Sequence, residues 1–173
     1  QDLNLIYNNS LIVEGESHFK NIAQLTFSGE NAEAYFSADG RKLIYQAHDG
    51  DSLCDQIYIM DIESKSVELV STGAGVTTCS FFKYPNDNGI IYSSTHMDNP
   101  DCPSKPDFSR GYIWKLYPGF DIYEAGLSGS NPVLLHRPLV MMLRQHILSM
   151  VKLTLQAQNS CFYNRMLLDH RCA

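Results

Sequence analysis

The stretch EAYFSADGRKLIYQAHDG, residues 33–50, decides the fold class of this protein. Residues 34–36 place their side chains alternately on opposite faces, which is the period-two pattern of a β-strand. Asp39-Gly40 then interrupts the pattern, and this dipeptide predicts a tight hairpin because glycine adopts a positive φ without a Cβ clash. The alternation resumes at Leu43, so the stretch predicts two antiparallel strands joined by a turn.

Two further strands follow this hairpin. Asp49-Gly50 marks a turn, residues 56–60 read as a third strand, and residues 67–70 read as a fourth that Thr72-Gly73 ends. Four short strands in sequential order form a meander, and a sheet of this size by itself leaves one face without a partner.

The same order recurs further along the chain. The second set of strands is predicted at residues 80–82, 90–92, 121–123 and 133–135. Its second and third strands are separated by an insertion, residues 94–118, whose four prolines suit a surface loop because proline cannot join a strand ladder. A repeat of roughly 40–50 residues with four strands is typical of propeller blades.

The repeat resembles a known family. FSADGRKLIY, residues 36–45, is similar to the F-S-P-D-G-x-x-I-x-[FY] core of the TolB-like (WD-repeat-like) propeller repeats. The segment that follows this core in the family is similar to two stretches of the chain, DQIYIMDI (residues 55–62) and FDIYEAGLSGSN (residues 120–131). Ala38 replaces the usual proline, and the second repeat keeps only the turn with Gly89. The resemblance covers roughly residues 19–131 and implies the fold, because the shared positions are turns and core residues that carry little information on activity.

The sequence therefore predicts an all-β protein, a partial β-propeller of about two four-stranded blades with an irregular or helical C-terminal tail. Residues 1–27 form an N-terminal segment that contains the outer strand of a preceding blade, at residues 22–27. Residues 28–77 form the first blade, residues 78–131 the second, and residues 132–173 an atypical tail. Two blades cannot close a ring, so three aromatic residues are expected to lie exposed where a neighbouring blade would cover them: Phe36, Phe82 and Tyr92.

The tail has two interpretations. Residues 141–158 carry apolar side chains near helical spacing, which predicts an amphipathic helix packed on the blades. Alternatively, the codons available to residues 139–145, read in a shifted frame, can encode the opening of a third blade. The tail would then be frame-shifted and the chain a fragment, and the nucleotide sequence decides between the two.

Composition narrows the classes of partner and the compartment. A net charge of −6 argues against a nucleic-acid binder, and no apolar run reaches the roughly 18 residues that membrane insertion needs. The chain begins at Gln1 with no visible signal peptide, so we expect a fragment or a processed product. Asn8-Asn9-Ser10 fits an N-glycosylation acceptor and, with the family resemblance, favours a periplasmic or extracellular location.

No catalytic, cofactor-binding or metal-binding residue is predicted. The segment from Gly126 to Ser130 is interpreted as a hairpin turn, because a nucleophile elbow needs a glycine two residues after its serine. Asp49, Asp51 and Asp55 could offer oxygens to calcium, but a solvated turn is the favoured interpretation since the full ligand spacing is missing. His96 could line the mouth of a propeller, and a hydrogen-bonded structural histidine is favoured over that role.

The five cysteines include no C-x-x-C pair, and their odd number leaves at least one outside any internal disulfide. Cys54 and Cys102 both lie between the second and third strands of their repeats, so a bridge between them would hold the insertion. No spacing rule identifies disulfide partners, and unpaired buried thiols are the favoured interpretation.

The insertion is the chemically varied segment that the repeat does not explain. Its predicted partner-binding residues combine aromatic rings with a positive charge, as protein interfaces do: Phe108, Arg110, Tyr112, Trp114 and Tyr117. The alternative is a loop that folds back on its own blade, with Trp114 and Tyr117 as anchors. We expect a non-enzymatic scaffold, without a cofactor, for a protein or peptide partner of unknown identity. The alternative is an accessory propeller of a larger hydrolase, of the prolyl-oligopeptidase type or a zinc aminopeptidase.

Overall fold

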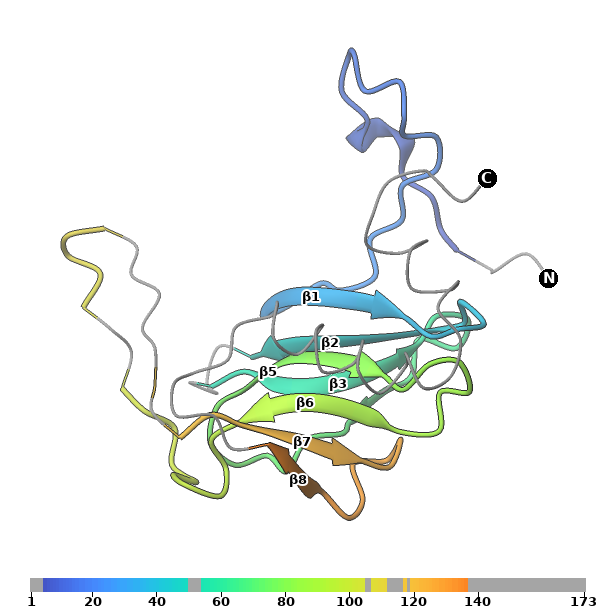
Figure 1. The fold of residues 1–173 in the computed structure, drawn as a ribbon. Coiled ribbons are helices and arrows are strands. Elements are labelled where there is room, and N and C mark those ends of the chain that lie inside the picture. The colour runs from blue at the N-terminus through green and yellow to red at the C-terminus, as the bar shows by residue number, and fades with distance from the viewer. Residues whose placement is uncertain (1–4, 50–53, 105–106, 112–116, 118, 137–173) are drawn as a thin grey trace, which may run out of the picture.

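The computed structural model describes residues 5–49, 54–104, 107–111, 117 and 119–136 (Figure 1). The predicted helix or irregular structure of residues 132–173 therefore falls largely outside the described residues. Among the residues described, no helix has the length and apolar character needed to cross a bilayer.

Eight strands form two four-stranded antiparallel sheets, each in sequential order. The first sheet contains β1 (Glu30–Phe36), β2 (Lys42–His48), β3 (Gln56–Asp61) and β4 (Val67–Leu69). The second contains β5 (Thr77–Phe82), β6 (Ile90–Ser94), β7 (Asp121–Ala125) and β8 (Val133–His136). A short 3-10 helix, η1 (Asn9–Leu11), precedes them. The all-β fold with two blade-like meanders, predicted from the repeat, is confirmed.

The turn at Asp39-Gly40 has the conformation that the sequence predicts. Gly40 has a φ of 71°, and its N–H donates to the carbonyl of Ser37 over 2.9 Å. The Asp39 carboxylate accepts hydrogen bonds from the Arg41 N–H (3.0 Å) and from the Ser37 hydroxyl (2.7 Å). These bonds hold the pKa of Asp39 below its ordinary value, because they favour the charged form.

The core lies between the two sheets, where β5 packs against β1, β2 and β3 (Figure 1). The buried side chains that meet there come from both sheets: Ile44, Ile57, Ile59, Val70, Phe82, Ile90, Tyr92, Tyr123 and Ala125. Such a contact covers one face of each sheet, which neither sheet could cover alone.

The expectation that Phe36, Phe82 and Tyr92 lie exposed is correct for only one of them. Phe36 is 51% exposed, whereas Phe82 is 1% exposed and Tyr92 is fully buried. The physical reason is that the second sheet turns the face bearing Phe82 and Tyr92 toward the first sheet. The alternation shows that a strand has two faces but not which face the neighbouring sheet covers.

The strand predicted at residues 22–27 is not formed in the structure. A strand needs a neighbour to share its backbone hydrogen bonds, and neither of the two described sheets takes this segment as a fifth strand. Leu25 instead packs against a small buried cluster of the first sheet, formed by Tyr45, Ala47 and Met60. Nearer the N-terminus, the segment drawn in darker blue in Figure 1 extends away from the sheets.

The contrast between Phe82 and Phe36 gives a test of this core. We expect Phe82→Ala to lower the free energy of unfolding by about 3–5 kcal/mol, because it leaves a cavity between the sheets. Phe36→Ala removes the same atoms from an exposed site and is expected to cost less than about 1 kcal/mol. Urea unfolding of the two variants measures both values, and equal losses would contradict this packing.

Candidate functional site

The candidate functional site is the root of the insertion, where the chain leaves β6. The carbonyl of Thr95 accepts a hydrogen bond from the N–H of Asn99 over 2.7 Å, which closes a turn. The Thr95 hydroxyl oxygen accepts from the N–H of Val76 over 3.0 Å. The N–H of Gly75 donates to the carbonyl of Pro100 over 2.7 Å. The segment that joins the two sheets therefore holds the beginning of the insertion.

Two glycines allow this close approach. Gly75 has a φ of +63°, and a Cβ there would lie 2.6 Å from Thr95 Oγ1 and 2.9 Å from the carbonyl oxygen of Asn99. At the other end of the insertion Gly119 has a φ of +84°, and a Cβ would lie 2.1 Å from Asp98 Oδ2. Both positions need glycine for its positive φ and for its missing side chain. The chain therefore passes close to other atoms of the protein at both ends of the insertion.

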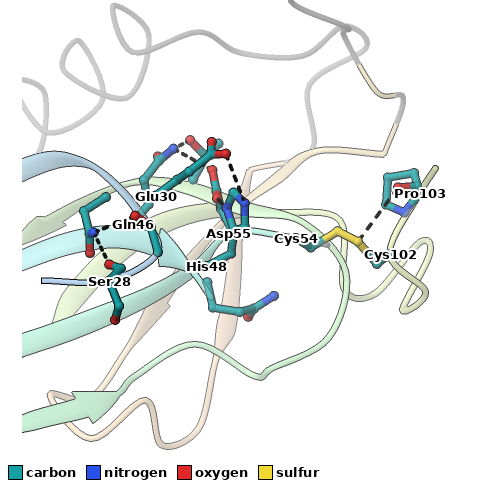
Figure 2. A network of polar contacts seen from close by, with 12 residues as sticks. Ser28, Glu30, Gln46, His48, Cys54, Asp55, Cys102 and Pro103 are labelled. Carbon is teal, nitrogen blue, oxygen red and sulfur yellow. Dashed lines mark hydrogen bonds and ion pairs between the residues drawn. A yellow bond between two sulfur atoms is a disulfide. The ribbon is translucent and has the colours of Figure 1, made fainter. Parts of the chain in front are cut away.

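A disulfide joins the root to the first sheet. Cys54, just before β3, bonds to Cys102 in the insertion, with Cα atoms 5.7 Å apart (Figure 2). The sequence favoured unpaired thiols, and for this pair that interpretation is wrong. The bond forms because equivalent loops of two packed sheets lie side by side, whereas the two cysteines are 48 residues apart in sequence.

A polar network next to the disulfide links the sheets (Figure 2). The Asp55 carboxylate accepts from Gln46 Nε2 over 2.9 Å, and its other oxygen lies 2.5 Å from His48 Nδ1. The side-chain oxygen of Gln46 accepts from the Thr78 hydroxyl and from the N–H of Cys79, both on β5. Both oxygens of Asp55 are thus bonded, so the chain that leads from Cys54 into β3 is fixed relative to both sheets.

The acidic residues of this loop are the ones whose oxygens calcium would use. Asp51 lies outside the described residues, Asp49 is exposed, and Asp55 is bonded to Gln46 and His48. In the part of the chain that the structure describes, no three His, Cys, Asp or Glu side chains gather so that they could hold a metal ion.

The predicted partner-binding residues fall in three places. Phe108 is 46% exposed and Arg110 is exposed, both on the yellow segment of the insertion that projects away from the sheets in Figure 1. Tyr117 is half-buried where the chain returns toward β7, with its ring centre 6.5 Å from that of Phe120. Tyr112 and Trp114 lie outside the described residues.

Sequence reasoning missed Met97 at the root. This side chain is 69% exposed in the turn after β6. The sequence does mark this position, because Met97 is an apolar residue between two polar ones, shortly after the end of a predicted strand. Met97 therefore exposes a flexible apolar side chain beside the root.

His96 is held by aromatic packing. Its ring centre lies 4.2 Å from that of Tyr123 and 6.4 Å from that of Tyr92. Its Nδ1 atom is buried and has no hydrogen-bond partner among the described residues. Burial lowers the pKa of His96, and the nearby Asp121 carboxylate opposes this effect. Burial also raises the pKa of the neighbouring Tyr92 hydroxyl, to about 12. His96 is therefore a packing residue rather than the hydrogen-bonded histidine that the sequence favoured.

The glycine clamp can be tested with a matched pair of substitutions. Gly75→Ala adds a methyl group against the Thr95 hydroxyl and two backbone atoms, whereas Gly40→Ala adds one at a similar φ of +71° with nothing within 4 Å. We expect Gly40→Ala to cost about 1–2 kcal/mol of unfolding free energy from backbone strain. Gly75→Ala is expected to cost about 1–3 kcal/mol more because of the added steric conflict. Equal costs by denaturant unfolding would argue against a tight root.

The burial of His96 predicts a pH dependence of stability. Its pKa in the folded protein lies below the ordinary 6.5, so the unfolded chain binds the proton more tightly. The free energy of unfolding is therefore expected to fall as the pH drops through 6.5 and toward the folded-state pKa. His96→Gln removes this titration, so the loss of stability between about pH 7 and pH 5 should be smaller in the variant. Thermal unfolding across this range provides the measurement, and identical profiles would contradict the assignment.

No protein-family model matches the sequence, and no curated protein matches it. Solved structures that are similar to the chain include a putative TolB from Agrobacterium tumefaciens, with 17% identity over 66% of this chain and 36% of that one, at a TM-score of 0.48. TolB from Acinetobacter baumannii has 19% identity over 69% of this chain and 24% of its own, at a TM-score of 0.45. A prolyl endopeptidase structure has 16% identity over 72% of this chain and 18% of its own, at a TM-score of 0.40. The match therefore spans only about a third of the length of the first TolB structure.

Proposed function

We propose that this protein is a non-enzymatic propeller scaffold that binds a protein or peptide partner through the insertion. Residues 28–77 and 78–131 are the two blades in this proposal. The main observation in its support is that the root of the insertion is held in place while residues further along the insertion are exposed. The disulfide and Gly75 hold the root, while Phe108 and Arg110 are exposed on the projecting segment.

This arrangement suits binding for two physical reasons. A surface that is already ordered loses less conformational entropy when a partner docks, so more of the contact energy appears as affinity. Arginine and aromatic side chains also carry much of the energy of protein interfaces, because each offers a large contact area together with a polar group. Phe108 and Arg110 supply these two kinds of side chain within three residues of each other.

The disulfide also supports a location in an oxidising compartment. Disulfides persist in the periplasm and outside the cell and are rare in the reducing cytosol. We therefore propose that the protein works in the periplasm or extracellularly.

The proposal is tested by selecting peptides from a random display library on the oxidised protein. We expect Phe108→Ala and Arg110→Ala each to weaken the affinity of the selected peptides by about tenfold or more, as interface anchors do. Phe27→Ala is the matched control, since it removes an 83% exposed ring from the N-terminal segment. Its affinity should stay within about twofold of the unmodified protein, the range expected for a residue outside the interface.

Two outcomes would overturn this function. One is a set of peptides whose affinity none of the insertion variants changes. The other is hydrolysis of the peptides by the purified protein. The full coding sequence tests the alternative of an accessory domain, which requires a catalytic domain in the same reading frame.

A further inference from the structure

The turn between β5 and β6 is the counterpart, in the second repeat, of the Asp39-Gly40 turn in the first. It contains Asn88-Gly89, and Asn88 is exposed. An asparagine followed by glycine is a chemically reactive pair, since the peptide nitrogen after the asparagine can reach its side-chain amide carbon. Glycine has no side chain to obstruct that approach.

The two turns differ in how these groups are bonded. In the first turn, the N–H of Gly40 donates to the carbonyl of Ser37, and the Asp39 carboxylate accepts from Ser37 and Arg41. In the second turn, neither the Asn88 side chain nor the N–H of Gly89 makes a hydrogen bond to another described residue. The nitrogen and the amide that would react are therefore both unengaged in the second turn.

The residues on either side of this pair are held. The N–H of Lys83 donates to the carbonyl of Gly89 over 2.9 Å. The Asp87 carboxylate accepts from the N–H of Ala38, in the first sheet's turn, over 2.6 Å. Its other oxygen is buried and has no hydrogen-bond partner among the residues described. Asn88 thus directly follows a residue that ties the second sheet to the first.

We propose that Asn88 is a site of spontaneous deamidation, and that its conversion loosens the alignment of the two sheets at this turn. This site lies in the β5–β6 turn rather than in the insertion, so the inference does not depend on the proposed function.

The reaction consumes one water and releases one ammonia. The nitrogen of Gly89 loses its proton to solvent and attacks Cγ of Asn88, which forms a new N–Cγ bond. The Cγ–Nδ2 bond breaks, and Nδ2 takes a proton from solvent and leaves as ammonia, so a five-membered succinimide remains. Water then adds to one of the two ring carbonyls. Addition at Cγ restores the ordinary chain as aspartate, whereas addition at the main-chain carbonyl carbon gives isoaspartate, in which the chain runs through Cγ.

Isoaspartate adds one carbon to the main chain between Asp87 and Gly89. Gly89 has little room to move, because a Cβ there would lie 2.7 Å from the carbonyl oxygen of Ala125. The added length is therefore expected to displace Asp87. The new carboxylate also places a negative charge next to Asp87, and this further disfavours its charged form. Burial already raises the pKa of Asp87; the hydrogen bond from Ala38 opposes this, and the Asp39 carboxylate adds to it.

Peptide mapping by mass spectrometry tests the modification on the full oxidised chain, kept folded at mildly alkaline pH. We expect Asn88 to convert at least about tenfold faster than Asn31 and Asn86, because the residues that follow those two carry side chains. An enzyme that methylates isoaspartyl carboxylates identifies the isoaspartate product. Asn88→Gln is the matched control and should stay unconverted, since its longer side chain would have to close a six-membered ring.

The urea-unfolded chain, kept at the same pH, shows whether the fold permits the reaction. Asn88 should convert in both states. If it stays intact in the folded protein after the unfolded chain has lost it, the proposal is overturned.

Amide hydrogen exchange tests the structural effect. We expect the Ala38 N–H to exchange about three- to tenfold faster in the isoaspartate form, as the loss of one hydrogen bond predicts. The Gly40 N–H, bonded within the first turn, should keep its rate. Asn88→Asp adds the charge without the extra carbon and should change the Ala38 rate less. An unchanged Ala38 rate after conversion would overturn the effect on alignment, and so would faster exchange throughout β5 and β6, because the damage would then not be local.

Discussion

The contact between the two sheets is the interaction on which the rest of the structure depends. Each sheet is a four-stranded meander, and such a sheet is stable only when one of its faces is covered. Phe82, Tyr92 and Tyr123 of the second sheet meet Ile44 and Ile57 of the first in a buried layer. Burial of these side chains supplies the free energy that holds the sheets together, at roughly 1.5–3 kcal/mol for each large side chain that leaves water.

Polar contacts at both ends of this layer fix how the sheets are aligned. At the turn end, the Asp87 carboxylate accepts from the N–H of Ala38 over 2.6 Å, and the Tyr84 hydroxyl donates to the carbonyl of Phe36. At the loop end, Gln46 bonds to Thr78 and Cys79 of β5. Apolar contact alone would tolerate sliding of one sheet over the other. Directional hydrogen bonds at the two ends remove that freedom because each has a narrow range of distance and angle.

The fixed alignment explains how the candidate site forms. Cys54 and Cys102 occupy equivalent connections of the two repeats, and packing one repeat on the other brings these connections together. Gly75, on the chain between the sheets, then lies close enough to Thr95 and Asn99 to clamp the root. The site is thus a consequence of the same packing that stabilises the fold. The segment with the exposed residues Phe108 and Arg110 follows this root along the chain.

The sequence by itself determined the order of strands and the turn at Asp39-Gly40, because both follow from local rules of alternation and of φ at glycine. It also placed the insertion and marked Phe108 and Arg110 as residues that the repeat does not explain. Only the tertiary structure decided which aromatic residues are buried, since Phe36 and Phe82 follow the same alternation but face different surroundings. The pairing of Cys54 with Cys102 likewise required the packed sheets. In both cases the deciding quantity is the distance between segments far apart in sequence, which a local pattern of residues does not contain.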